Sequence, residues 1–334
     1  MRAIVITGVG GPEVLEVREV PTPEPSGKQV RVRVRACGLN RADLLQARGH
    51  YPAPPDAPAD IPGLEYAGEV EALGPDVTGP LRVGDRVFGI VGGGGQAESV
   101  LTHERLAVPI PPNLDFVTAA AVPEAFLTAH DALLTQGRLA PGRRVLIHAA
   151  GSGVGTAAVQ LAHAMGCTVF GTSRTAAKLE RVKALGLDQG IDTSHEDFAA
   201  VVQSQTGGAG VDVIVDFLGG PALAGNLAAL APRGRLVLVG LLGGTSAPLD
   251  LNLMLRKRLT IVGTTLRARP LEEKIAATRR FAEEVIPWLA RGLVHPVVDS
   301  VFPFEEVRAA LARLESNQVF GKVVLRMGSP LFKV

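Results

Sequence analysis

Hydrophobic and polar positions alternate along the first third of the chain. The clearest stretch is residues 29–36, where Val30, Val32 and Val34 are separated by arginines. A period of two is typical of a strand that buries one face and exposes the other. Short alternating stretches continue to about Ala120, so we expect this part of the chain to be mostly β. The arginines between the valines are expected to face solvent.

A different pattern runs from about Glu124 to Leu266. Compact apolar runs alternate there with segments of helical spacing. This order predicts a buried parallel sheet with connecting helices. The expected strands are residues 145–148, 168–172, 212–216, 236–240 and 259–263.

The last part of the chain returns to the first pattern. We expect helices over residues 271–291 and 305–316 and a final strand over residues 322–326. This order of patterns predicts that a nucleotide-binding domain is inserted into a catalytic domain, which is therefore formed by two separate parts of the chain. The expected divisions are residues 1–123, 124–266 and 267–334.

Residues 145–157, reading VLIHAAGSGVGTA, form an apolar run, a turn of small residues and the start of a helical pattern. Such a turn lets the main chain approach a pyrophosphate, and the helix directs its positive end there. The residues differ from the GxGxxG motif, so the alternative to a dinucleotide site is an ordinary strand-to-helix turn. The preceding strand and the following helix favour a dinucleotide site. Its predicted contacts are Ala150, Gly151, Ser152, Gly153, Val154 and Gly155.

The residues after the next strand indicate which nucleotide binds. NAD sites of this type place an acidic side chain about 20 residues past the glycines, where it holds the ribose hydroxyls. Here that place reads Ser173 and Arg174, and Lys178 follows one helical turn later. With no carboxylate to repel a 2′-phosphate and two cations to bind it, the sequence predicts NADPH. The alternative is that Arg174 and Lys178 only solvate the start of a helix.

Composition and charge exclude several other kinds of partner. The 334 residues include 34 Lys and Arg and 33 Asp and Glu, so the net charge is +1. This charge is too small to attract nucleic acid or an anionic membrane. The N-terminal apolar stretch is too short for the core of a signal peptide, and no run of 18 apolar residues follows. Cys37 and Cys167 form no disulfide framework and no CxxC pair. We expect a cytoplasmic protein.

Several motifs together give a family resemblance over nearly the whole chain. They are GGPEVLEV near the start, LNRADLLQARGHY at residues 39–51, GLEYAGEVEALG at 63–74, VGDRVFG at 83–89, PEAFLTA at 123–129, the turn above and FGKVVL at 320–325. The chain resembles the zinc-independent medium-chain dehydrogenase/reductases of the zeta-crystallin-like quinone oxidoreductase group. The resemblance implies an α/β protein in which a Rossmann doubly wound parallel-sheet domain is inserted in a mostly β, GroES-like catalytic domain.

The sequence departs from the zinc-using relatives at the position of their metal. Those relatives surround a catalytic metal with a cysteine, a histidine and a carboxylate or cysteine. Here Asn40 takes the cysteine position and Leu64 the histidine position, and glycines 92–95 replace the four-cysteine loop of a structural zinc. The seven histidines are scattered without ligand spacing. We therefore expect no bound metal.

The resemblance also implies which side chains lie near the nicotinamide. Asn40 and Tyr51 are expected beside its ring, and Thr128 is expected beneath its carboxamide. Tyr51 would hydrogen-bond the substrate oxygen or donate a proton, and the alternative is a loop tyrosine that covers an apolar rim. Asn40 is expected to position a ligand, because an amide does not titrate. Further implied cofactor contacts are Thr193, Leu218, Gly240, Leu241, Leu242, Thr265, Leu266 and Lys322.

Reduced nicotinamide delivers hydride to an electron-poor acceptor without help from a metal, provided that the protein orients the two and excludes water. Quinones are such acceptors, so we expect an NADPH-dependent quinone oxidoreductase. One alternative is NADPH-dependent reduction of an activated C=C bond in an enone, alkenal or enoyl thioester, which also needs a polarising donor and a proton source. Another is a nucleotide-binding structural or regulatory protein with little turnover. The resemblance implies a homodimer that pairs edge strands near residues 253–263.

Overall fold

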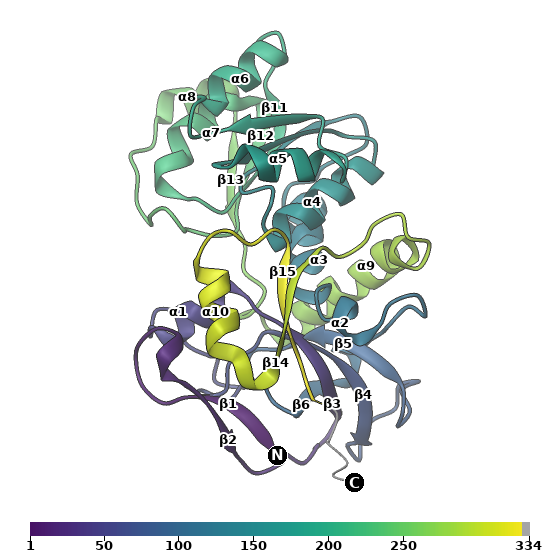
Figure 1. Ribbon diagram of the computed structural model, residues 1–334. Coiled ribbons are helices and arrows are strands. Elements are labelled where there is room, and N and C mark those ends of the chain that lie inside the picture. The colour runs from purple at the N-terminus through teal and green to yellow at the C-terminus, as the bar shows by residue number, and fades with distance from the viewer. Residues whose placement is uncertain (329–334) are drawn as a thin grey trace. The chain divides into compact units, whose positions relative to one another are not determined.

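The structure, a computed structural model, describes residues 1–328, and its chain divides into two compact units (Figure 1). Unit 1 comprises residues 1–127, 266–292 and those from Pro296 onward. Unit 2 comprises residues 128–265 together with residues 293–295. The chain therefore enters unit 1, builds unit 2 and returns to unit 1.

Unit 1 is built on a seven-stranded sheet and a separate pair of strands. The sheet has the order β14-β15-β3-β4-β5-β7, with β6 paired to β3, and β1 pairs with β2. The predicted strand at residues 29–36 is confirmed as β3, and the predicted final strand is confirmed as β15. The bounds are β1 (Arg2–Ile6), β2 (Leu15–Glu19), β3 (Gln29–Gly38), β4 (Glu65–Leu73), β5 (Arg86–Ile90), β6 (Ser99–His103), β7 (Val108–Pro109), β14 (Val298–Pro303) and β15 (Lys322–Arg326).

The arginines of β3 are paired rather than simply solvated. Arg31 and Arg33 both form ion pairs with Glu71 of β4, at 2.8 and 3.2 Å. Arg35 pairs with Glu69 of the same strand at 2.6 Å. Only Arg33 is exposed, with 56% of its side chain accessible. The arginines therefore form cross-strand pairs that add to the main-chain ladder between β3 and β4, and their charges are balanced by glutamates.

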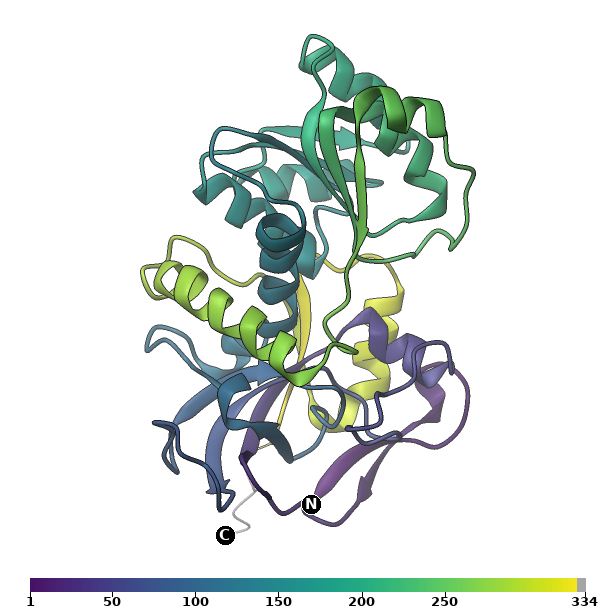
Figure 2. The ribbon, with the colours of Figure 1, turned by 180° about the vertical axis from the view of Figure 1, so that it is seen from behind.

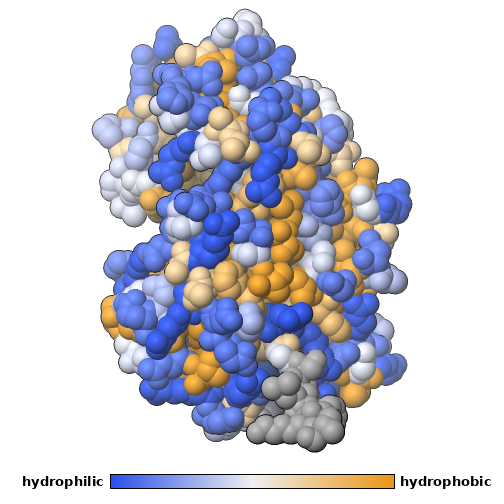
Figure 3. Space-filling view, in the orientation of Figure 1, coloured by the Kyte–Doolittle hydropathy of each residue, from blue (hydrophilic) through white to orange (hydrophobic). Residues whose placement is uncertain are grey.

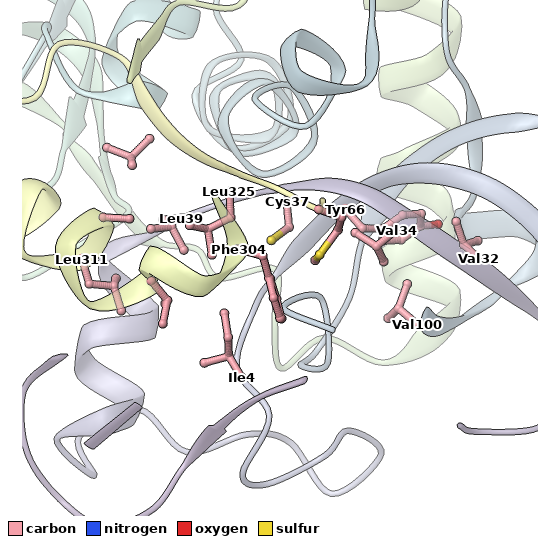
Figure 4. Packing of buried hydrophobic residues seen from close by; sticks show 14 of the residues in the cluster. Ile4, Val32, Val34, Cys37, Leu39, Tyr66, Val100, Phe304, Leu311 and Leu325 are labelled. Atoms are coloured by element: carbon pink, nitrogen blue, oxygen red, sulfur yellow. The ribbon is translucent and has the colours of Figure 1, made fainter. Parts of the chain in front are cut away.

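The valines of β3 point into the core of unit 1, which Figure 4 shows from close by. Val32 and Val34 pack there with Leu39, Tyr66 and Phe304, each no more than 2% exposed. The helices of the unit are α1 (Arg41–Ala47), α2 (Phe116–Ala119), α3 (Pro123–His130, which crosses into unit 2), α9 (Leu271–Ala290) and α10 (Val307–Glu315).

The two helices expected near the end of the chain are both present. The helix predicted at residues 271–291 is α9, which Figure 2 shows in light green as one continuous helix. The second is α10, which begins at Val307 because a short 3₁₀ turn, Phe304–Glu306, precedes it. Figure 1 shows α10 in yellow beside α1 and β15.

Unit 2 is a six-stranded parallel sheet with the order β10-β9-β8-β11-β12-β13. The five predicted strands are present, although β12 begins six residues before the predicted start, because Leu230 pairs with Val211 before the register shifts. The short strand β10 was missed, since Ile191 is its only fully buried residue. The bounds are β8 (Arg144–Ile147), β9 (Thr168–Ser173), β10 (Gln189–Asp192), β11 (Val211–Asp216), β12 (Leu230–Leu238) and β13 (Thr260–Gly263).

The helices of unit 2 connect these strands. Figure 1 shows them in teal and green around the sheet. Those described are a π-helical turn (Asp131–Gln136), α4 (Gly153–Ala164), α5 (Ala176–Lys183), α6 (Phe198–Gln205), α7 (Leu223–Ala229) and α8 (Leu251–Lys257).

The expectation of an edge strand across residues 253–263 is only partly right. Asp250 caps a helix there, because its carboxylate accepts a hydrogen bond from the main-chain N–H of Leu253 at 2.8 Å. Leu253 therefore lies in α8, and the edge strand β13 begins at Thr260.

Hydrophilic and apolar residues are intermixed over the face of the molecule that Figure 3 shows. Within residues 1–328, no helix has the length and apolar character that crossing a membrane requires.

Candidate functional site

The carboxyl ends of the parallel strands in unit 2 form one edge of the sheet. The chain runs outward from β8 in both directions, through β9 and β10 on one side and through β11, β12 and β13 on the other. Ligands of open α/β sheets bind outside the strand ends where the order reverses, here between β8 and β11. The structure places most predicted nucleotide contacts just past these ends: residues 150–155 after β8, 173–174 at and after β9, 193 after β10, 218 after β11, 240–242 after β12 and 265 after β13.

The turn after β8 brings the main chain close to the start of α4. A Cβ at Gly155 would lie 2.4 Å from the main-chain oxygen of Ala149, so only glycine allows this approach. Ser152 is the N-cap of α4, and its hydroxyl accepts a hydrogen bond from Gly155 N at 3.0 Å. Ala149 has a φ of 46°, which side chains disfavour and which a tight turn imposes. A turn of small residues before a helix N-terminus fits the pyrophosphate of a dinucleotide.

Ser173, Arg174, Lys178 and Thr193 lie together beside the start of α5. Thr193 donates its main-chain N–H to the Ser173 oxygen at 2.9 Å. Arg174 is exposed, and Lys178 lies in the first turn of α5. Thr175 is the N-cap of α5, yet its side chain makes no capping hydrogen bond. A helix start without a side-chain cap and with two neighbouring cations suits a phosphate group.

The segments after β11 and β12 are tied to each other. Leu242 N donates to Phe217 O at 3.0 Å, and Gly243 N donates to Leu218 O at 2.8 Å. Leu218 and residues 240–242 therefore form one surface at the edge of the sheet. Thr265 is exposed, and it is the last residue of the main segment of unit 2. Leu266 is buried, and the chain re-enters unit 1 there.

The side-chain hydroxyl of Thr128 is a candidate for a hydrogen bond with a ligand. Its Oγ1 is buried and has no hydrogen-bond partner among the described residues. A buried hydroxyl without a partner destabilises a protein by about 1–3 kcal/mol. A ligand that supplies the partner recovers this free energy on binding. This orphaned hydroxyl fits the carboxamide of a nicotinamide, the group expected above Thr128.

A buried polar network lies directly beneath the turn after β8. His148 is fully buried, with Nδ1 2.9 Å from the Thr172 hydroxyl and Nε2 2.7 Å from Oδ1 of Asn226. Asn226 donates its Nδ2 to Asp216 at 3.1 Å, so its Oδ1 is an acceptor and Nε2 of His148 carries the proton. Burial lowers the pKa of His148, although the Asp216 carboxylate opposes this. His148 is therefore a neutral, structural residue.

In unit 1, Asn40 joins a buried cluster with Glu65 and Lys322. The Lys322 ammonium lies 2.6 Å from Glu65 Oε1 and donates to Leu39 O at 2.8 Å and to Asn40 Oδ1 at 2.6 Å. Glu65 Oε1 also accepts from Asn40 Nδ2 at 2.9 Å, and Oε2 accepts from the main-chain N–H of Glu124 at 2.8 Å. All three ammonium hydrogens thus have partners inside unit 1. The structure shows this internal role for Lys322, which was predicted to contact the cofactor.

Two further carboxyls lie beside this cluster. Asp43 accepts from the main-chain N–H of Asn40 at 2.8 Å, and burial raises its pKa to about 6. Burial and the Glu65 carboxylate raise the pKa of Glu124 to about 7, against the opposing effect of Lys322. Three carboxyls therefore surround one lysine.

Tyr51 is held by Arg267, a residue that the sequence reasoning did not single out. The guanidinium donates to Tyr51 O at 2.9 Å, to Gly92 O at 2.7 Å and to Gln46 Oε1 at 2.6 Å. Its Cζ also lies 4.9 Å from the centroid of the Tyr51 ring, within cation–π range. Arg267 is 6% exposed. It fastens the loop that carries Tyr51 to the glycine run at residues 92–95.

These partnerships could not be predicted from local sequence patterns. Glu65 and Lys322 are 257 positions apart and share no motif. Arg267 stands between Leu266 and Ala268 in a segment rich in arginine, and nothing in that segment marks it as buried. The available signal was a lone lysine at the start of an apolar strand. Among residues 1–328, the structure contains no group of three or more His, Cys, Asp or Glu side chains suited to hold a metal ion.

The buried His148 predicts a particular dependence of stability on pH. Because its pKa is lower in the folded protein, the unfolded chain takes up the proton first as pH falls below about 6.5, and stability declines by at most about 1.4 kcal/mol per pH unit. His148→Gln should remove this part of the slope. Urea unfolding between pH 5 and 8 measures it, with the exposed His195→Gln as control. An unchanged slope in His148→Gln would contradict the assignment.

Arg267→Met should loosen the Tyr51 loop, since it keeps the apolar stem but removes three charge-assisted hydrogen bonds, each worth about 1.5–3 kcal/mol. Hydrogen exchange at residues 46–51 should accelerate at least tenfold. Arg279→Met is the control, because that arginine pairs only with Glu283 on the exposed face of α9. Wild-type exchange in Arg267→Met would mean that other contacts hold the loop.

Comparison with known proteins agrees with this geometry. Residues 26–112 match the family model for the alcohol dehydrogenase GroES-like domain, and residues 153–289 match that for a zinc-binding dehydrogenase. The chain is 34% identical over 330 residues to a quinone oxidoreductase of Lama guanicoe, covering 97% of each.

Two solved structures are similar over nearly their whole length. The Escherichia coli quinone oxidoreductase complexed with NADPH gives a TM-score of 0.88 at 27% identity, covering 98% of this chain and 100% of that chain. The CurK enoyl reductase gives a TM-score of 0.87 at 30% identity, covering 98% and 99%. These matches confirm the α/β class, with a GroES-like region and a Rossmann-like parallel sheet. The chain is therefore a pyridine-nucleotide-binding oxidoreductase and belongs to the medium-chain dehydrogenase/reductase family, in its quinone oxidoreductase group.

Proposed function

We propose that the protein is an NADPH-dependent quinone oxidoreductase that works without zinc. The observation that carries this proposal is the Asn40 amide, held between an ammonium and a carboxylate. An amide offers a hydrogen-bond donor to an acceptor oxygen, but it is neither a strong acid nor a metal ligand of the kind that zinc enzymes use. Such a site suits an acceptor that takes hydride readily. The similarity to proteins named quinone oxidoreductase supports the same acceptor class.

We assign each residue a part in this reaction. When bound, reduced nicotinamide supplies the hydride. The turn at residues 150–155 would hold the pyrophosphate, and Thr128 would fix the carboxamide. Asn40 would orient the acceptor oxygen, and Tyr51 would donate a second hydrogen bond or a proton.

The preference for NADPH over NADH rests on the start of α5. Arg174 and Lys178 would neutralise the 2′-phosphate, with Ser173 and the uncapped helix start beside them. Asp192 lies opposite Ser173 in the register of β10 and β9. Its carboxylate accepts hydrogen bonds from the main-chain N–H and the hydroxyl of Ser194. Thr193, next to it, would line the same phosphate.

Replacing both Arg174 and Lys178 by alanine should therefore weaken NADPH far more than NADH. We expect the KM for NADPH to rise about 30- to 100-fold, the effect of two lost charge-assisted contacts, with the KM for NADH nearly unchanged. Steady-state kinetics with both nucleotides measure this ratio. Lys183→Ala is the matched control, since that lysine of α5 pairs with Glu180. Equal losses for both nucleotides would assign the two cations to the fold.

A second candidate function is reduction of an activated C=C bond, which the similarity to CurK enoyl reductase favours. This reaction needs a proton donor at carbon, and Tyr51 is the candidate. Tyr51→Phe should then slow enone turnover at least tenfold more than quinone turnover, measured by NADPH oxidation. An equal effect on both acceptors would assign Tyr51 to packing. Nucleotide binding without turnover of any acceptor would favour the structural or regulatory alternative.

We further propose a homodimer formed through the edge of the unit 2 sheet. β13 is an edge strand, and Leu251 and Leu255 of the preceding α8 are 68% and 75% exposed. Exposed leucines beside an unpaired edge suit a second copy of the chain. Sedimentation equilibrium should give twice the mass of the chain, and a monomer at micromolar concentration would contradict this proposal. The cytoplasmic location stays a prediction.

A further inference from the structure

Asn40 is the N-cap residue of helix α1. An asparagine at this position ordinarily accepts a hydrogen bond from the first turn of the helix. Asp43, in the first turn, accepts from the main-chain N–H of Asn40 at 2.8 Å, which is one half of a capping box. The Asn40 amide is turned toward Lys322 and Glu65. The amide of this N-cap residue therefore has two charged partners outside the helix.

The two partners of the amide allow it only one orientation. Lys322 can only donate, so it must face the amide oxygen, as it does at 2.6 Å. The Glu65 carboxylate can only accept, so it must face the amide nitrogen, as it does at 2.9 Å. A rotation of 180° would set N–H groups against the ammonium and the carbonyl against the carboxylate. The charges therefore exclude the flipped amide.

The pair that fixes Asn40 is itself fixed. Glu65 is 0% exposed and Lys322 is 4% exposed, and the ammonium makes contacts with Leu39 O and Asn40 as well as with Glu65. A Cβ at Gly38 would lie 2.3 Å from Glu65 Oε1 and 2.7 Å from Ala120 O, so glycine is required to admit the carboxylate. The Glu124 main-chain N–H holds the second carboxylate oxygen. The cluster has no freedom to turn the amide.

One hydrogen of the amide is left over. Nδ2 of Asn40 carries two hydrogens, of which Glu65 takes one. The other contact is with Gly38 O at 3.5 Å, beyond the usual range of an N–H···O hydrogen bond. Asn40 therefore presents one N–H donor whose direction is set by its charged partners.

We propose that Lys322 and Glu65 are positioning residues that lock the Asn40 amide, so that its remaining N–H donates to the carbonyl oxygen of the acceptor. This inference rests on the proposed function, because it takes the acceptor to be a quinone or an enone. It also replaces the expectation that Lys322 contacts the nucleotide.

The first test is a double-mutant cycle on kcat/KM for a quinone. Lys322→Met and Asn40→Leu should each lower it about 10- to 100-fold, as the loss of an oriented donor or of its support does. Because Lys322 acts through Asn40, the variant that carries both changes should be no slower than the slower single variant. Losses that multiply would mean that the two side chains act separately, and would overturn the proposal.

The second test separates positioning from nucleotide binding and from folding. Lys322→Met alone leaves a buried carboxylate without its cation, so we pair it with Glu65→Gln, which removes both charges. The neutral pair should bind NADPH, followed by nucleotide fluorescence, within about twofold of wild type. Binding weakened more than tenfold in a folded variant would make Lys322 a nucleotide contact and overturn the proposal.

A third measurement needs no turnover, so it distinguishes failure of this inference from failure of the proposed function. In protein labelled with ¹⁵N-asparagine, the Asn40 side-chain hydrogen that is donated to Glu65, assigned through Asn40→Leu, should exchange with solvent slowly. In the neutral pair its exchange should accelerate at least tenfold. Equal protection in both proteins would show that the charges do not hold the amide. An enzyme that turns over neither quinone nor enone would refute the proposed function alone.

Discussion

The ion pair between Lys322 and Glu65 is the interaction on which the arrangement of unit 1 depends. It joins the first residue of β15 to the first residue of β4, strands that lie on either side of β3. Removing water from both charges is costly, and loss of one partner from a buried pair typically costs about 3–5 kcal/mol. The protein accepts this because the pair sets the orientation of Asn40 at the end of β3. At Asn40 this chain has a neutral amide held by an internal ammonium.

A different constraint governs unit 2, where the main chain must approach a ligand closely. The parallel sheet brings six strand ends to one edge and reverses its order beside β8. Gly155 admits α4 to the turn, and Ser152 caps that helix from within the same turn. Beneath the turn, both ring nitrogens of His148 have hydrogen-bond partners, Thr172 and Asn226. Geometry supplied by the backbone, more than any side chain, is the basis for proposing this edge as the nucleotide site.

Secondary structure set by neighbouring residues could be predicted from the sequence. Side-chain partners brought together from distant parts of the chain could not. The strands of unit 2 were found because buried parallel strands are apolar without interruption, whereas β10 has one buried residue and gave no such signal. Leu253 was expected in a strand because its neighbours are apolar, but the cap from Asp250 makes that segment a helix. The strand, turn and helix at residues 145–164 could be predicted because they are contiguous in the sequence. Lys322, Glu65 and Arg267 acquire their roles only from residues brought to them by the fold, which no local pattern records.

We propose that this family member reduces quinones with NADPH by means of its own side chains and no metal. The most direct test is NADPH oxidation by chelator-treated protein, followed with a para-quinone and a simple enone side by side. The account predicts that quinone turnover survives chelation unchanged and exceeds enone turnover. Loss of turnover on chelation that zinc restores, or enone reduction without quinone reduction, would contradict it.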